Sequence, residues 1–169
     1  MEDIKKMFQR REEIRLRNQS LQSEYNRGLL KCITPHFHVQ PSKMDFSKLK
    51  DGSTYYDEGV EVLSIDFDIL MSLDFMIGVL RNKSSREEIK KTWFTENQTW
   101  DVFEFWKKGE PLIPPSIFWN DYNDETQFLD GRHRLVVACY LGITKTPIIC
   151  PKSHISKIKK LHPEFTQVK

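Results

Sequence analysis

Residues 129–150, LDGRHRLVVACYLGITKTPIIC, contain the clearest secondary-structure pattern in the chain. The apolar run from Leu135 to Leu141 stops at Gly142, which is typical of a short buried helix with a glycine at its C-terminal end. Thr146-Pro147 then leads into Ile148 to Cys150, an apolar run suited to a buried strand. The order strand, glycine turn, helix, glycine and strand predicts an α+β fold.

The segments upstream predict more strands and a helix. Two apolar and aromatic runs, at residues 116–119 and 126–129, flank the turn-forming sequence NDYND and predict a β-hairpin. Residues 60–65 alternate enough to predict a buried strand. The apolar stretch 69–80 then predicts a helix, and either Asp66 or Asp68 is placed to cap its first turn.

Helix signals and a long connection fill the rest of the chain. The serines at positions 84 and 85 are followed by glutamates at capping-box spacing, so a helix is expected to begin there. A further helix is expected to start after Thr99 and to stop at Lys108-Gly109. Residues 34–59 are rich in Pro, Ser, Asp and Gly and predict an extended, irregular connection.

Residues 3–31 predict one long charged helix that ends near Gly28 to Lys31, ahead of Thr34-Pro35. One face of it carries a weak stripe at three- and four-residue spacing, made of Ile4, Met7, Arg11, Ile14, Asn18, Leu21, Tyr25 and Gly28. Such a stripe is suited to packing across its own domain or to pairing with a second copy as a homodimer. We therefore divide the chain into an N-terminal helical extension, residues 1–33, and a domain spanning residues 34–169.

The composition predicts one folded domain. Of the 169 residues, 38% are hydrophobic and 12% aromatic, which is enough apolar material for a core. The most membrane-like stretch, Val62 to Leu80, carries three aspartates, which argues against a membrane span. Three widely spaced cysteines fit no zinc pattern, and the N-terminus has mixed charge in place of an apolar signal segment. A reducing cytoplasm is the expected location.

The net charge of +2 is unevenly distributed. Residues 1–31 hold eight Lys/Arg against five acids, and residues 152–169 hold five Lys against one acid. The remaining middle of the chain is acidic, with 13 basic and 18 acidic residues. Basic ends around an acidic body suggest arms that contact nucleic acid or another polyanion, and ordinary solvated helix faces are the alternative.

The turn Asp130-Gly131-Arg132-His133-Arg134 carries the sharpest chemical signal. A helix that starts directly after a glycine presents unpaired backbone N–H groups and the positive end of its dipole. The three residues after the glycine add cationic or hydrogen-bonding side chains, and a planar guanidinium suits phosphate oxygens. The pattern indicates an anion site with phosphate as the expected ligand. The alternative is a solvated helix start with Asp130 as its N-cap.

Residues 129–150 resemble the signature of the ParB/sulfiredoxin superfamily, in which a strand ends in a Gly-x-x-Arg-like turn and an alanine-rich helix, a glycine and a Val/Ile-Pro-Val-type strand follow. Residues 109–119, GEPLIPPSIFW, are similar to the segment that precedes the hairpin in ParB-like domains, and residues 60–70, VEVLSIDFDIL, to their opening strand and helix. The strong match covers residues 109–150. The resemblance implies a mixed-sheet α+β domain of this type with an added long N-terminal helix.

Members of this superfamily bind nucleotides at the turn: CTP in chromosome-partition ParB, ATP in sulfiredoxin, and ADP or ATP in a ParB-like free-serine kinase. The resemblance implies a nucleoside di- or triphosphate with Mg²⁺ here, held at Gly131, Arg132, His133 and Arg134, with the backbone amides and Arg134 on the phosphates. If the protein is an enzyme, Mg²⁺-dependent nucleotide hydrolysis or phosphoryl transfer is the expected reaction, with Asp130 and His133 as catalytic residues.

Two departures from the superfamily pattern narrow these expectations. Sulfiredoxin has a catalytic cysteine between the glycine and the histidine, where this chain has Arg132, which argues against reduction of cysteine sulfinic acid. Partition ParB continues into a helix-turn-helix and a dimer domain, and the 19 residues after Cys150 are too few for either.

Other hypotheses stay open beside nucleotide binding. One is a DNA-associated ParB-like protein or nuclease that uses its basic termini, and another is a non-catalytic interaction module. Asp66 and Asp68 lie two residues apart, so on a strand both carboxylates would share a face as a metal site requires; helix capping is the alternative. We also expect Arg134→Ala to abolish nucleotide binding while leaving the melting temperature nearly unchanged.

Overall fold

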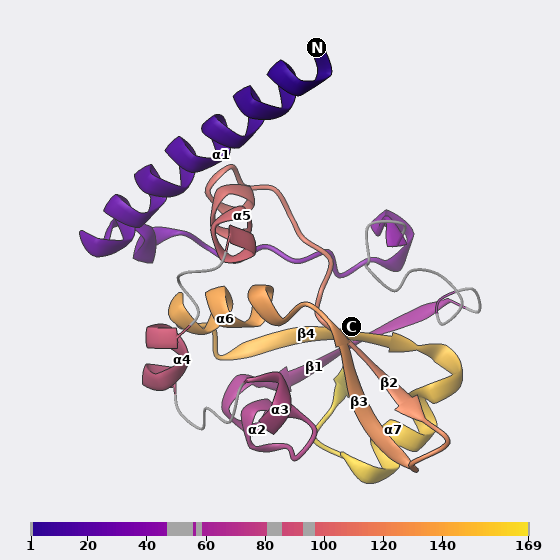
Figure 1. Cartoon of the computed structure of the whole chain (residues 1–169). Helices are drawn as coiled ribbons and strands as arrows, with labels where there is room; N and C mark the ends of the chain where they lie inside the picture. The colour runs from indigo at the N-terminus through magenta and orange to yellow at the C-terminus, as the bar shows by residue number, and fades with distance from the viewer. Residues whose placement is uncertain (1, 47–55, 57–58, 81–85, 93–96, 169) are drawn as a thin grey trace.

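The computed structural model describes residues 2–46, 56, 59–80, 86–92 and 97–168, and it shows a five-stranded mixed sheet, helices around it and a long N-terminal helix (Figure 1). The α-helices are α1 (Glu2–Asn26), α2 (Phe67–Ser72), α3 (Met76–Val79), α4 (Arg86–Thr92), α5 (Asn97–Lys107), α6 (Arg132–Tyr140) and α7 (Ile155–Leu161). The strands are β1 (Val60–Asp66), β2 (Ser116–Asn120), β3 (Glu125–Asp130), β4 (Lys145–Pro151) and β5 (Thr166–Gln167). Short 3₁₀ helices are η1 (Leu29–Cys32), η2 (Pro41–Lys43) and η4 (Lys152–His154). The predicted combination of a mixed α/β architecture and a long N-terminal helix is confirmed.

The strands lie in the order β3-β2-β4-β1-β5, so the strand predicted at Ile148 to Cys150 is in the centre of the sheet. β4 pairs antiparallel with β1 along its whole length, and it meets β2 in a parallel sense where Ser116 lies beside Ile149. β2 and β3 form the predicted antiparallel hairpin. The sheet is therefore mixed, and β4 has a neighbouring strand, β2 or β1, on each side.

The side chains of β1 divide between two apolar clusters. Leu63 and Ile65 belong to the main core, whereas Val60 and Val62 point to the other face of the sheet. On that face a smaller cluster forms from Met44, Tyr56, Val60, Val62, Ile113 and Ile149. Because both faces of the central strands are covered, the sequence of β4 contains a continuous run of apolar residues and does not alternate between apolar and polar residues.

Helix α6 is buried over most of its length. Its residues from Leu135 to Tyr140 are all buried, and both α4 and α5 pack against it (Figure 1). The Tyr140 ring makes an edge contact with Phe103 of α5, with 5.7 Å between the ring centroids. This burial on every side explains why the helix has no polar face in the sequence. In the part of the chain that the structure describes, no helix is long and apolar enough to cross a membrane.

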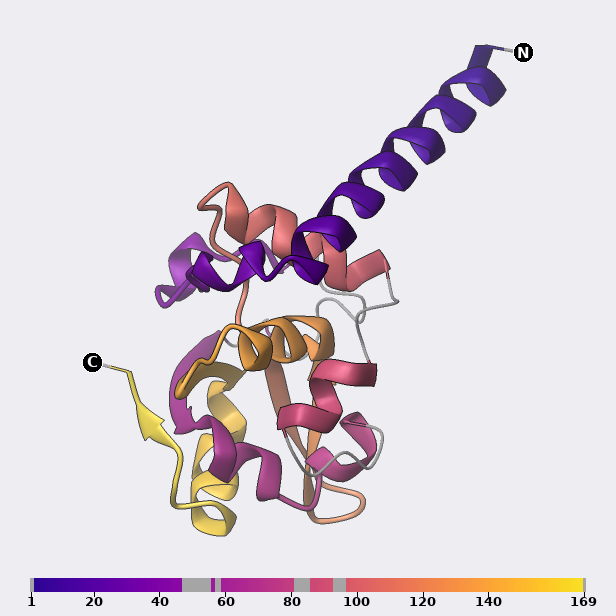
Figure 2. The same ribbon diagram turned by 90° about the vertical axis from the view of Figure 1, so that its left-hand side faces the viewer.

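Helix α1 packs on the body only through its C-terminal half. Leu21 is buried, and the Tyr25 ring lies 6.0 Å from that of Trp100 and 5.0 Å from that of Tyr140. The N-terminal half extends away from the body in both views (Figures 1 and 2). At about 1.5 Å per residue, the 25-residue helix is roughly 37 Å long.

Arg17 fastens α1 to α5. Its guanidinium donates hydrogen bonds to Asp101 at 2.5 Å and to Glu104 at 2.7 Å. Lys108 also donates to Glu104, and these contacts lower the pKa of the Glu104 carboxyl. The α1–α5 junction is thus a network of charges beside a buried leucine and aromatic rings in edge-on and tilted contact.

The helix predicted over residues 69–80 is broken into α2 and α3 by an extended Leu73, whose φ is −73° and ψ 137°. Leu70 and Met76 are both fully buried, and in an unbroken helix they would point to widely different sides. The break lets both face the same core. Elsewhere α5 begins at Asn97, before the expected Thr99, and the serines predicted to cap α4 lie outside the described residues.

Asp66 is the N-cap of α2, as one of the two alternatives predicted. Its carboxylate accepts hydrogen bonds from the backbone N–H groups of Asp68 and Ile69 at 2.9 and 3.3 Å. Asp68 pairs instead with Arg86 and is largely exposed. Capping therefore accounts for Asp66, and an exposed ion pair accounts for Asp68.

We expect Asp66→Ala to lower the free energy of unfolding by about 1 kcal/mol, since two N–H groups of α2 lose their acceptor. Urea denaturation followed by circular dichroism measures the change. Asp66→Asn keeps an acceptor oxygen and is expected to lose less, and Asp68→Ala should change little because its ion pair is exposed. Equal losses in all three variants would contradict the capping role.

Candidate functional site

The turn from β3 into α6 is shaped by Gly131. Its φ of +100° lies in the left-handed region, and a Cβ at this position would lie 2.6 Å from Pro115 Cα and 2.9 Å from Pro115 Cβ. Both the backbone conformation and the close approach of the connection before β2 therefore require glycine. Gly131 itself is the N-cap of α6, so the alternative in which Asp130 caps the helix is wrong.

Two hydrogen bonds from the Arg134 side chain stabilise this turn. The side chain is 12% exposed, and it donates one hydrogen bond to the Ile113 carbonyl and one to Asp130 Oδ2, both at 2.5 Å. Burial lowers the pKa of Arg134, and the Asp130 carboxylate opposes that shift. The guanidinium ties the first turn of α6 to the end of β3 and to the connection before β2.

Two pockets meet at the turn. The first, of about 480 Å³, lies among the 38–45 segment, α5 and residues 110–113. The second, of about 510 Å³, lies among α3, β3 and the start of α6. The residues common to both are Gln98, Asp130, Gly131 and His133. Volumes of this size are typical of sites for small molecules.

The five residues of the predicted turn therefore have different environments. Asp130 and Arg134 bond to each other, and Gly131 forms the close contact with Pro115. His133 lines both pockets, and Arg132 lines the second. The two arginines diverge because residues two apart on a helix point to opposite sides. Of the predicted ligands, Arg134 and His133 line the first pocket, and Arg132 and His133 line the second.

The wall of the first pocket comes from a segment that the sequence predicts only as an irregular connection. Phe37 and Leu112 form a parallel β-bridge, and the backbone N–H of His38 donates to the Leu112 carbonyl at 2.9 Å. Trp106 Nε1 donates to the His36 carbonyl at 2.7 Å. These bonds bring His38 and Lys43 to the pocket.

Sequence reasoning weighed His38 only as a weak metal ligand together with His36, and it missed Lys43 and Gln98. Gln98 lies in the first turn of α5 and lines both pockets, although it is far from the glycine turn in the chain. A single polar residue in a helix or in an irregular segment has no periodicity, so nothing in the sequence distinguishes it. The long-range packing of α5 beside α6 decides its position.

Asp66 and Asp68 are the weak candidates for metal ligands. Asp66 instead caps α2, and Asp68 forms an ion pair with Arg86. Among the described residues, no group of three or more His, Cys, Asp or Glu side chains is arranged to hold a metal ion. The buried thiol of Cys150 has its pKa raised to about 12 by burial, which leaves it protonated and unreactive at neutral pH.

The fold and the turn define a mixed α/β domain with a candidate anion site between two pockets. Comparisons with protein-family models, with curated proteins and with solved structures found no match for this chain. The case for a function therefore depends on the geometry and chemistry of the site itself.

The structure reverses the expected effect of Arg134→Ala on stability. Removing a buried guanidinium leaves Asp130 and the Ile113 carbonyl without their donor, so we expect a loss of about 2 to 4 kcal/mol in the free energy of unfolding. Chemical denaturation measures it, with Arg27→Ala, at an exposed arginine, as the control.

A double-mutant cycle with Arg134→Met and Asp130→Asn measures the interaction energy between Arg134 and Asp130 separately from the other packing contributions to stability. We expect the two substitutions to couple by at least about 1 kcal/mol, as residues in direct contact do. Additive losses would show that Arg134 does not hold the turn through Asp130.

Proposed function

We propose that this protein binds a nucleoside di- or triphosphate with Mg²⁺ at the turn from Gly131 to His133, in a domain of the ParB/sulfiredoxin type. One observation carries the proposal: the N-terminus of α6 lies where two pockets meet. The turn before it requires glycine at position 131 and is stabilised by the hydrogen bond from Arg134 to Asp130. The N–H groups at the start of α6 and the helix dipole favour an anion there.

The division of side chains at the turn fits a phosphate ligand. Arg132 lines the second pocket and His133 lines both, so a guanidinium-bearing and an imidazole-bearing residue stand beside the turn. Charge-assisted hydrogen bonds from such groups are the strong contacts of phosphate sites. In this proposal Arg134 is a positioning residue, and the phosphate contacts come from the amides, Arg132 and His133.

The two pockets match the two chemically different ends of a nucleotide. The first pocket has an apolar side made by Val102, Phe105, Leu112 and Ile113, which suits a base. The second pocket contains Arg132, which suits the phosphates. The shared turn lies between them, so a single ligand can place its phosphates against α6 and its nucleoside against α5.

Mg²⁺ fits this site as an ion that arrives with the nucleotide. It usually keeps several waters and binds through one or two carboxylates together with substrate phosphates. Asp130 is the carboxylate at the turn, and its Oδ2 accepts from Arg134, which leaves Oδ1 as the oxygen for a cation. When bound, the ion would neutralise phosphate charge.

If the protein is an enzyme, the arrangement of residues at the turn fits nucleotide hydrolysis or phosphoryl transfer. His133 is the acid–base candidate because it lines both pockets. The other predicted catalytic residue, Asp130, is engaged with Arg134, so we assign it to positioning and to the cation.

The superfamily assignment is supported by the order of elements around the turn. The β2–β3 hairpin leads through the glycine turn into α6, and Gly142, with φ +79°, leads on to β4. This is the order in which the resembling motif runs. The parallel contact between β2 and β4 brings the two ends of that motif together in one sheet.

The DNA-binding alternative receives less support from the arrangement of charges. The basic ends of the chain, in α1 and α7, lie at opposite ends of the molecule in both views (Figures 1 and 2). One cation at each end already forms ion pairs: Arg17 with Asp101 and Glu104, and Lys157 with Asp121. The two ends therefore present no single basic surface.

A thermal-shift panel of nucleotides with Mg²⁺ tests the proposal. A bound nucleotide at about one hundred times its Kd is expected to add about 2.7 kcal/mol of stability. Arg132→Gln should weaken binding by roughly tenfold or more, because one charge-assisted phosphate contact is lost. Arg27→Gln removes an exposed arginine outside both pockets and is expected to bind normally.

The outcomes separate the three hypotheses. No shift with any nucleotide, or equal affinity in Arg132→Gln, would refute the nucleotide site and leave the non-catalytic module. Binding to duplex DNA that falls steeply with salt, in the absence of a nucleotide shift, would favour the DNA-associated alternative. Released inorganic phosphate that disappears in His133→Ala would add the enzymatic step.

A further inference from the structure

Helix α5 presents one side to the first pocket. Four residues at three- and four-residue spacing make up this side, which we call the α5 row: Gln98, Asp101, Val102 and Phe105. Gln98 also lines the second pocket, whereas Phe105 lines only the first. At a rise of about 1.5 Å per residue, the row extends roughly 10 Å from the junction of the two pockets. A ligand with its phosphates at that junction would therefore lie along the row.

Phe105 is the exposed aromatic residue of α5. It is 43% exposed, whereas the rings of Trp100, Phe103 and Trp106 on the same helix are at most 3% exposed. Those three rings belong to the main core, so they account for the packing of α5 on the body. An aromatic ring that remains exposed in a pocket is available to stack on a planar base. The far end of the α5 row therefore suits the base of a nucleotide.

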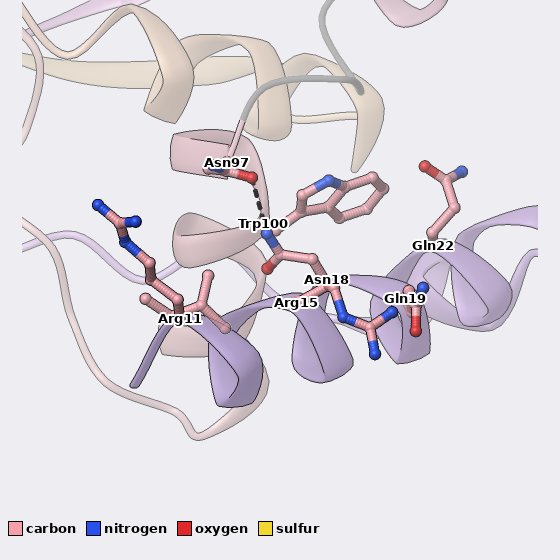
Figure 3. A pocket seen from close by; sticks show the side chains of 8 residues that line it. Arg11, Arg15, Asn18, Gln19, Gln22, Asn97 and Trp100 are labelled. Atoms are coloured by element: carbon pink, nitrogen blue, oxygen red, sulfur yellow. Dashed lines mark hydrogen bonds between the residues drawn. The ribbon is translucent and has the colours of Figure 1, made fainter. Parts of the chain in front are cut away.

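A different side of α5 lines a separate groove against α1 (Figure 3). Asn97 and Trp100 line this groove from α5, and Asn18 Nδ2 of α1 donates to Asn97 Oδ1 at 2.8 Å. Trp100 is only 3% exposed, so its ring is not available for stacking. Among the described residues, none lines both this groove and the first pocket. One side of α5 therefore contacts α1, and the α5 row faces the ligand pocket.

The first pocket contains more carboxylates than cationic side chains. The described residues that line it include four acids, one lysine and one arginine: Asp45, Asp101, Glu110, Asp130, Lys43 and Arg134. An excess of carboxylates repels phosphate and accepts hydrogen bonds from hydroxyl and amino groups. The second pocket has Arg132 beside the single carboxylate of Asp130. These charges favour the phosphates in the second pocket and an uncharged, donor-rich nucleoside in the first.

Asp101 lies in the middle of the α5 row, about one helical turn from Gln98 and one from Phe105. Its Oδ1 accepts a hydrogen bond from Arg17 of α1 at 2.5 Å, and its side chain is 45% exposed. The contact with Arg17 holds the carboxylate group and leaves Oδ2 as the acceptor for a ligand. A carboxylate between the phosphate and base positions is level with the sugar. Dinucleotide-binding folds use an acidic side chain in this way for the ribose 2′-hydroxyl.

We infer that the nucleotide is a ribonucleotide, whose base stacks on Phe105 and whose ribose hydroxyls donate to Asp101. The inference rests on the proposed function, because it takes the phosphates to lie at the start of α6. A 2′-deoxyribonucleotide lacks one of the donors and loses a charge-assisted hydrogen bond to the carboxylate. The α5 row thus selects ribose over deoxyribose, and Phe105 adds affinity for any base because every base has a π face.

Isothermal titration calorimetry with ATP, GTP, CTP and UTP, each with Mg²⁺, and with their 2′-deoxy forms tests the ribose contact. The ribose form of a bound nucleotide is expected to bind roughly tenfold tighter than its 2′-deoxy form. Asp101→Ala should reduce this preference to at most about twofold, because the charged acceptor is lost. Glu104→Ala is the matched control. It also removes one carboxylate that binds Arg17, but Glu104 does not line the pocket, so the preference should remain.

Phe105→Leu tests the stacking separately. The substitution keeps an apolar side chain at an exposed position, and it should weaken every bound nucleotide by roughly tenfold. Tripolyphosphate with Mg²⁺ has no base, so it should bind equally to the wild-type chain and to this variant. Thermal unfolding of each variant without ligand shows whether the body of the protein is intact.

Several results would overturn the inference. One is equal affinity of the wild-type chain for the ribose and 2′-deoxy forms, a comparison that needs no variant. Others are a ribose preference that survives in Asp101→Ala or disappears in Glu104→Ala, and unchanged nucleotide affinity in Phe105→Leu. If nucleotides bind in these cases and Arg132→Gln still weakens them, the proposed function stands and the inference fails. If no nucleotide binds to the wild-type chain, both fail.

Discussion

The part-buried contact between Arg134 and Asp130 organises the turn from β3 into α6. It links the first turn of α6 to the last residue of β3, and the second hydrogen bond of Arg134 adds the connection that leads into β2. Gly131 makes this geometry sterically feasible, because Pro115 occupies the space that a side chain would need. Three segments are thereby held at one point, and the start of α6 is directed at the junction of two pockets.

Adjacent residues of one short motif have separate tasks in this arrangement. Asp130, Gly131 and Arg134 make the contacts that build the turn and also line the first pocket. Arg132 lines the second pocket, and His133 lines both. The separation follows from helical geometry, since side chains two residues apart point to opposite sides. A guanidinium that is buried and hydrogen-bonded gives the site rigidity. In the function that we propose, the guanidinium at the pocket supplies positive charge for a phosphate ligand.

Helix α1 shows how one sequence pattern serves two environments. Its C-terminal half uses the stripe in the way that packing across its own domain predicts, with Leu21 buried and Tyr25 against Trp100. Its N-terminal half leaves Ile4, Met7 and Phe8 in solvent. Packing on its own domain therefore accounts for the C-terminal half of the stripe, and it does not account for the exposed apolar side chains of the N-terminal half.

The sequence by itself determined the order of strands and helices from β2 to β4, the glycine turn and the fold class, because glycine, proline and apolar spacing act within a few residues. Only the tertiary structure decided that α2 and α3 are separate helices, that Arg134 points inward, and that Gln98 and His38 reach the pockets. Each of these depends on contacts between segments far apart in the chain. A local pattern carries no information about which distant surface will cover a residue or leave it exposed.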